Sequence, residues 1–132
     1  MSVTNYQYWP FDPSSATGGF VLDDDKIEFF REATAGGFEA FRFGVNDYGA
    51  KSNGREGCIL ERGRAQWEIR LSEGDQRRLV AYVRDFSAAG RAVTAWLGGS
   101  DARQIVANLH DQLVTPAGAK ASYRIAHSDS SQ

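Results

Sequence analysis

A short stretch of alternating residues, 66–71, constrains the fold of this chain more than any other part of the sequence. Its apolar members, Trp67, Ile69 and Leu71, are separated by polar residues, which is the period-2 pattern of a strand buried on one face. A second strand precedes it at 57–61, and a four-residue connection containing a glycine joins the two. The sequence therefore predicts a β-hairpin near the middle of the chain.

Two helices are predicted after this hairpin. The first covers residues 72–88, because Ser72 suits the N-cap position and Gly90 can end the helix in a left-handed conformation. Its apolar residues recur at helical spacing, namely Leu79, Val83 and Phe86. The second covers residues 101–113, with Ser100 as its N-cap.

Further segments carry the alternation or the flanking turn residues of strands. These predicted strands cover residues 20–22, 26–33, 38–45, 91–97 and 121–127. Residues 91–97 could also continue a helix, and the glycines on both sides of this segment favour the strand. The polar stretch 46–56 between them is predicted to be a loop. Strands gathered first and helices later favour an α+β fold, with a mostly antiparallel sheet of five to seven strands and two helices packed on one face.

The length of the chain fits one domain. It has 132 residues, of which 42% are hydrophobic, and this is enough apolar material for a core. We expect an irregular N-terminal segment over residues 1–19 that packs on the domain through Trp9 and Phe11. A single α+β domain then covers residues 20–127, and a polar tail covers 128–132.

Cysteine content and hydropathy bear on the compartment. Cys58 is the one cysteine, so no intramolecular disulfide can form, and this is typical of a reducing environment. The first residues show neither a basic region nor an apolar run of a signal peptide. No stretch approaches the roughly 20 apolar residues that a membrane span requires. We therefore expect a cytoplasmic protein that does not enter a membrane.

The residue types that carry chemistry do not form a recognisable motif. Cys58, His110 and His127 lie on three separate predicted elements without the spacing of metal ligands, and the aspartate run 23–25 lacks the pattern of a calcium loop. Cys58 falls inside a predicted strand, where a buried and unreactive thiol is expected. The sequence therefore predicts no metal, no cofactor and no catalysis by this chain alone.

Charge is segregated along the sequence, although the formal net charge is only −2. Residues 1–50 hold three basic and eight acidic residues, whereas residues 51–91 hold nine basic and six acidic ones. Interspersed glutamates in the basic part oppose nucleic acid and favour a protein partner, and a salt-bridged surface or a solvated turn would explain the same charges without any partner. The candidate binding residues are Asp23, Asp24, Asp25, Tyr48, Arg55, Arg62, Arg64, Arg77 and Arg84.

These features favour a non-catalytic protein that binds another macromolecule. The class that fits is the immunity or inhibitor protein of bacteria and phage, which acts by protein–protein contact, and a homodimer is a second way to use oppositely charged surfaces. The alternative is a domain that binds a small ligand or nucleic acid. Its pocket would lie between the sheet and the helices, lined by Trp67, Trp96 and Tyr123.

Overall fold

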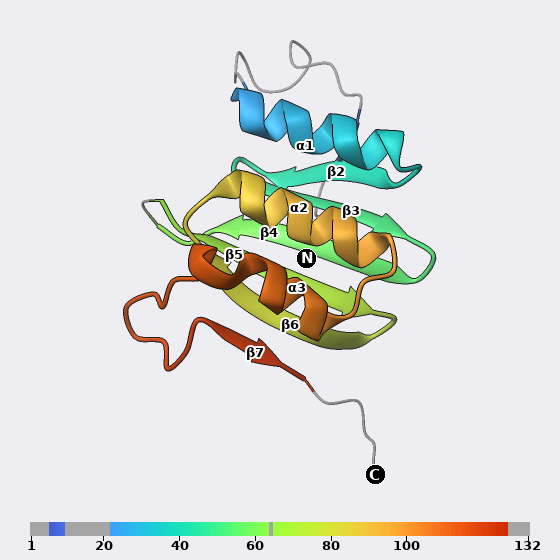
Figure 1. The fold of residues 1–132 in the computed structure, drawn as a ribbon. Helices are drawn as coiled ribbons and strands as arrows, with labels where there is room; N and C mark the ends of the chain where they lie inside the picture. Colours follow the sequence, from blue (N-terminus) through green and yellow to red (C-terminus); the bar gives the residue numbers. More distant parts are fainter. Residues whose placement is uncertain (1–5, 10–21, 64, 127–132) are drawn as a thin grey trace, which may run out of the picture.

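The computed structural model describes residues 6–9, 22–63 and 65–126. The described chain forms a seven-stranded antiparallel sheet, and its helices all lie on one face of that sheet (Figure 1). The spatial order of the strands equals their order in the chain, so each strand pairs with its neighbour in sequence. The predicted α+β class and the antiparallel sheet are confirmed.

Five consecutive strands, β2 to β6, form the middle of the chain, and the helices lie before and after them. The strands are β1 (Gln7–Tyr8), β2 (Glu39–Gly44), β3 (Asp47–Ser52), β4 (Arg55–Glu61), β5 (Trp67–Glu73), β6 (Gln76–Val83) and β7 (Tyr123–Ile125). The helices are α1 (Asp24–Ala35), α2 (Phe86–Leu97) and α3 (Ala102–Leu109), and α3 continues into a 3-10 turn, η1 (His110–Gln112). The described part thus holds three α-helices, one more than the sequence predicts.

Several predicted elements are confirmed within a few residues. The strands expected at 57–61 and 38–45 are β4 and β2, and the helix expected over 101–113 is α3 with η1. The final strand, expected over 121–127, is shortened to β7. The strand expected at 20–22 falls mostly outside the described residues.

The prediction of a strand over residues 26–33 is wrong, because this segment belongs to α1. Its buried residues are Lys26, Phe29, Phe30 and Ala33, which stand at the i, i+3, i+4 and i+7 positions of one helical face. Two adjacent phenylalanines can occupy that face together, whereas in a strand they would point to opposite sides.

The prediction of a helix over residues 72–88 is also wrong. β5 continues to Glu73, the chain turns at Gly74 with a φ of 60°, and β6 follows. Leu79, Ala81 and Val83 are all fully buried, and this is the period of a strand. The spacing of Leu79 and Val83 fits both periods, which is why the helical interpretation failed.

The helix that follows, α2, replaces the strand predicted over residues 91–97. Phe86, Ala89, Val93 and Trp96 share its buried side. Gly90, which the sequence suggested as a stop, lies inside this helix. A Cβ at Gly90 would come within 3.2 Å of Cδ1 of Phe29 on α1, so the glycine permits the two helices to approach each other closely.

The stretch 46–56 is a hairpin and not the predicted loop. β3 and β4 pair in register and are joined at Asn53 and Gly54, whose φ angles are 51° and 83°. Positive φ at both central residues defines the type I′ turn, for which Asn-Gly is the preferred sequence. The polarity of this segment hid a strong hairpin signal.

The core lies between the sheet and α2, which crosses the middle of the sheet (Figure 1). The Phe86 ring is its centre, at 5.0 Å from the Trp67 ring and 5.3 Å from the Tyr48 ring. Gly57 on β4 permits the close approach of this helix, since a Cβ there would stand 2.8 Å from Cγ1 of Val93. α2 thereby covers the middle of this face, and residues of α1 and α3 complete the core.

Candidate functional site

The opposite face of the sheet is covered by none of the described helices, and we call it the helix-free face. Residues paired across antiparallel strands point to the same side, so the register defines which side chains form this face. One row crosses all seven strands: Tyr8, Phe41, Gly49, Cys58, Arg70, Val80 and Arg124. The row passes from aromatic residues at one edge to arginine at the other.

An aromatic patch, made of Tyr6, Tyr8, Phe41 and Phe43, occupies the β1–β2 end of the helix-free face. The Tyr6 ring lies 5.0 Å from the Phe41 ring and 5.7 Å from the Phe43 ring, and Tyr8 lies 5.7 Å from Phe41. Phe41 is fully buried, while Tyr6 and Tyr8 are 45% and 43% exposed. Gly49 leaves room for this stack, because a Cβ there would stand 2.7 Å from the Phe41 ring.

The charged residues on the rest of the helix-free face fall into a paired and an unpaired group. The Glu68 side chain is only 6% exposed and forms ion pairs with two arginines. Nε of Arg62 lies 3.1 Å from Oε1 of Glu68, and Nε of Arg70 contacts Oε2. Arg77 and Arg124 are exposed and form no ion pair with another described residue. The buried carboxylate is thus neutralised internally, and two guanidinium groups remain available at the β6–β7 side.

Cys58 lies in the middle of this face and does not have the properties of a nucleophile. Burial, reinforced by the charge of Glu56, raises the pKa of its thiol to about 12. Its Sγ stands 3.6 Å from Oε2 of Glu56. The thiol is therefore protonated near neutral pH, which removes the reactive thiolate.

The predicted aspartate run lies at the start of α1, and two of its members contact the following lysine. Lys26 is buried, with Nζ at 3.5 Å from Asp23 and 3.3 Å from Asp25. The same ammonium group lies 4.7 Å from the ring centroids of both Trp67 and Phe86. These two aspartates therefore balance a buried cation of their own chain.

Tyr48, predicted as a surface anchor, is a core residue. It is 2% exposed, and its ring stands 5.9 Å from the Phe30 ring and 5.3 Å from the Phe86 ring. Burial raises the pKa of its hydroxyl to about 12. Tyr48 therefore lies inside the protein, where its ring is not accessible to a partner.

Arg55 holds the helical layer to β4. Its Nη1 donates to the carbonyl oxygens of Trp96 and Ser100, both at 2.8 Å, and its guanidinium lies 3.9 Å from the Trp96 ring centroid. The Nε of Arg55 is also 3.6 Å from Glu73. These contacts satisfy carbonyl groups at and just after the end of α2, so the side chain is fully engaged inside the protein.

The remaining predicted binding residues do not form one surface. Asp24 is exposed on the first turn of α1, and Arg62 pairs with the buried glutamate described above. Arg77 belongs to the helix-free face, while Arg84 is exposed between β6 and α2. Arg77 and Arg84 both fall in the segment predicted as a helix over residues 72–88, but no helix spans them in the structure. Arg64 lies outside the described residues.

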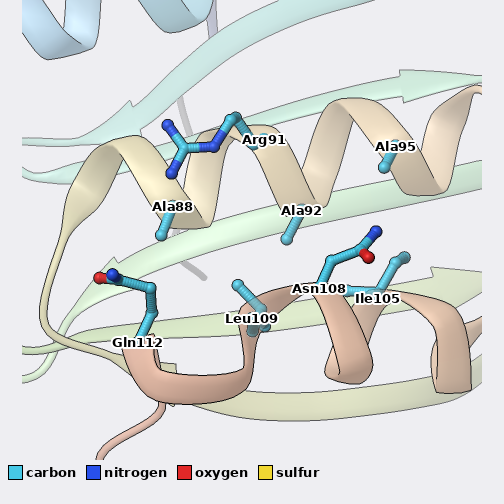
Figure 2. A pocket seen from close by; sticks show the side chains of 8 residues that line it. All are labelled: Ala88, Arg91, Ala92, Ala95, Ile105, Asn108, Leu109 and Gln112. Carbon is cyan, nitrogen blue, oxygen red and sulfur yellow. The ribbon is translucent and has the colours of Figure 1, made fainter.

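A cavity of about 220 Å³ lies between α2 and α3 (Figure 2). The pocket predicted for the alternative function is not assembled there. Trp67 and Trp96 are core residues, 9% and 2% exposed, and Tyr123 is exposed on the edge strand β7. Of these three, Trp96 borders a separate open hollow beside Arg55.

Within the described ranges, no group of three His, Cys, Asp or Glu side chains is placed to hold a metal ion. Every described helix is too short or too polar to cross a lipid bilayer. No protein-family model matches the sequence, and no match was found among curated proteins or solved structures.

Proposed function

We propose that this chain is a non-catalytic binding protein whose helix-free face contacts a partner protein. The observation that carries the proposal is the aromatic patch, in which Tyr6 and Tyr8 are over 40% exposed while resting on a buried phenylalanine. Tyrosines supply large contact areas at low entropic cost, and they are enriched in the centres of protein interfaces. The sheet behind them holds both rings in position before a partner arrives.

The charges on this face suit a partner that presents carboxylates beside an apolar surface. Arg77 and Arg124 lack ion-pair partners in the described chain, and guanidinium groups at a rim speed association with acidic surfaces. The protonated Cys58 thiol supports binding without covalent chemistry. An immunity or inhibitor protein acting in the cytoplasm fits this description, since such a protein needs a rigid contact surface and no reaction centre.

A single-stranded nucleic acid is the second candidate, and the same aromatic patch favours it. Exposed rings beside arginines form the stacking platforms on which unpaired bases lie. Glu56 points to the same face, however, and its carboxylate repels phosphate groups. This opposing charge makes a protein the better-supported partner.

The test compares two tyrosines of equal exposure on different sides of the sheet. Tyr8 is 43% exposed in the aromatic patch, and Tyr123 is 41% exposed on β7, where its register with Ala81 places it on the helix-covered side. A tagged chain is used to isolate its partner from the source cells, and affinities are then measured by calorimetry with the purified partner. We expect Tyr8→Ser to weaken binding about tenfold or more, as the loss of an interface anchor does, while Tyr123→Ser changes it less than about twofold.

The outcomes separate the candidates. Equal effects of Tyr8→Ser and Tyr123→Ser would remove the helix-free face from the interface. If no protein partner is found and the chain binds a single-stranded oligonucleotide with an affinity that falls steeply with salt, the partner is a nucleic acid. A wild-type dimer in light scattering that becomes a monomer on Tyr8→Ser would identify the partner as a second copy of the chain.

A further inference from the structure

The cavity between α2 and α3 has an apolar floor, and the residues that α2 contributes to it are small. On its α2 side stand three alanines, Ala88, Ala92 and Ala95, and on its α3 side stand Ile105 and Leu109. Because alanine side chains end at Cβ, the two helices are separated by space that larger residues would fill. The floor is well ordered by packing, since all of these residues except Ala95 are at most 5% exposed.

Polar groups gather only at the mouth of this cavity. Figure 2 shows the Arg91 guanidinium extending along α2 towards Ala88, while Asn108 and Gln112 reach up from the α3 side. The Arg91 guanidinium forms no hydrogen bond or ion pair with another described residue, although it also borders a smaller hollow towards α1 that Asp25, Glu28 and Glu32 line, and its charge partly offsets the rise that burial causes in the pKa of Glu32. No carboxylate lines the cavity. The mouth of the cavity therefore carries one guanidinium group and no carboxylate of its own.

Asn108 adds a hydrogen-bond donor to this mouth. Its Oδ1 accepts from Nε2 of Gln104 at 3.1 Å, one turn earlier on α3. This bond fixes the orientation of the amide and leaves its NH₂ group free to donate. A guanidinium and an amide donor at the entrance of an apolar slot are complementary to an acceptor with negative charge.

We propose that this cavity binds a small carboxylate that carries one apolar group. The apolar group lies on the floor between Ala92 and Leu109, and the carboxylate accepts hydrogen bonds from Arg91 and Asn108. The size agrees with this ligand class, since an apolar cavity of about 150 Å³ is enough for a benzene ring and the present one measures about 220 Å³. The site lies on the opposite side of the sheet from the aromatic patch and does not depend on the protein contact.

The test is a titration of the full chain, labelled with nitrogen-15, with phenylacetate, followed by two-dimensional NMR. Phenylacetamide and phenethylamine serve as neutral and cationic probes of nearly equal shape. We expect phenylacetate to shift the amide signals of Ala92, Ala95, Ile105 and Leu109. The amide probe should bind about tenfold more weakly, which corresponds to about 1.4 kcal/mol, and the amine should not bind.

Three variants locate the interaction. Arg91→Gln should weaken phenylacetate about tenfold, and Arg31→Gln, which removes the same charge from the exposed surface of α1, should leave it unchanged. Ala95→Leu fills the partly exposed end of the floor and should abolish binding without disturbing the fully buried core.

Four outcomes would overturn the proposal. These are the absence of shifts at the cavity amides at millimolar phenylacetate, equal binding of acid and amide, unchanged binding in Arg91→Gln, and shifts confined to the helix-free face. The amide spectrum of each variant shows whether it is folded. If Ala95→Leu unfolds, Ala95→Val supplies the same steric test with a smaller change in volume.

Discussion

Arg55 provides the sharpest test of how the helical layer is attached to the sheet. The sequence suggests a surface residue that binds a partner, whereas the structure places its guanidinium on two main-chain carbonyl groups of the chain itself. The perturbation is Arg55→Gln, which removes the positive charge and shortens the side chain. If the structural role is correct, the variant loses stability whether or not a partner is present.

The size of the effect follows from the contacts. Each of the two hydrogen bonds from the charged guanidinium, both 2.8 Å long, contributes about 1.5 kcal/mol. The stack on Trp96 at 3.9 Å adds about 0.5–1 kcal/mol. Because the Arg55 side chain is 22% exposed, water replaces part of these contacts in the variant. We therefore expect Arg55→Gln to lower the free energy of unfolding by about 2–3 kcal/mol.

Urea unfolding followed by tryptophan fluorescence measures this loss. With a slope of about 2 kcal/mol per molar urea, the midpoint should fall by about 1 M. Arg55→Lys should recover less than half of the loss, because the lysine side chain is shorter than the reach to Nη1 and lacks the planar group that stacks on Trp96. Arg77→Gln is the matched control on the exposed helix-free face and should change stability by less than about 0.5 kcal/mol. If Arg55→Gln and Arg77→Gln have the same midpoint, the attachment of α2 through Arg55 is refuted.

Two further predictions concern the core and its titration. Gly57→Ala should cost about 1–3 kcal/mol because the new Cβ would stand 2.8 Å from Val93, and Val93→Ala alone about 2 kcal/mol. In urea unfolding, the double variant should be about 1 kcal/mol more stable than the sum of the two single losses predicts. Strictly additive losses would contradict the contact between positions 57 and 93. Burial raises the pKa of Cys58 from 9.0 to about 12 and that of Tyr48 from 10.0 to about 12. The unfolded chain therefore loses these protons first, so the contribution of these two groups to stability should be constant below pH 9 and decline between pH 9 and 12. In Cys58→Ala, the decline should begin at the higher pH of about 10. If the urea midpoint of the wild-type chain does not fall between pH 9 and 12, neither group is buried.

The central hairpin could be predicted from sequence because its apolar residues fit one period only. Trp67, Ile69 and Leu71 alternate strictly, and all three are buried on the helix-covered face. Leu79 and Val83 gave the wrong helix because a separation of four residues satisfies both a strand and a helix. The buried Ala81 between them, a small residue with little weight in the pattern, decides in favour of the strand.

Glycine led to opposite errors in two places. Gly90 suggested the end of a helix, yet it lies within α2, where the ring of Phe29 on another helix needs the space. Gly54 was placed in a polar loop, yet with Asn53 it forms the tight turn between β3 and β4. The first error required knowledge of a distant contact, whereas the second could have been avoided from the Asn-Gly pair alone.

The candidate site was the least predictable part. Tyr6 and Tyr8 alternate around Gln7 as residues on one side of a strand do, but a two-residue strand is too short to stand out from an irregular segment. Their importance comes from Phe41 and Phe43, which reach the same place only through the pairing of β1 with β2. Such a patch is a product of register between distant segments, which a single sequence does not specify.

The two edge strands of the sheet are short, and this affects how readily the sheet can be extended by another molecule. β1 and β7 contain 2 and 3 residues, whereas the strands between them contain 6 to 8. Beyond the short β7, the backbone of β6 is occupied by irregular chain, as Tyr82 donates to Ser122 and accepts from Val114. A free border strand is a template on which other molecules add strands and form fibres. In the described part of the chain, the five long strands thus lie between two short edge strands, which give a neighbouring molecule little backbone on which to extend the sheet.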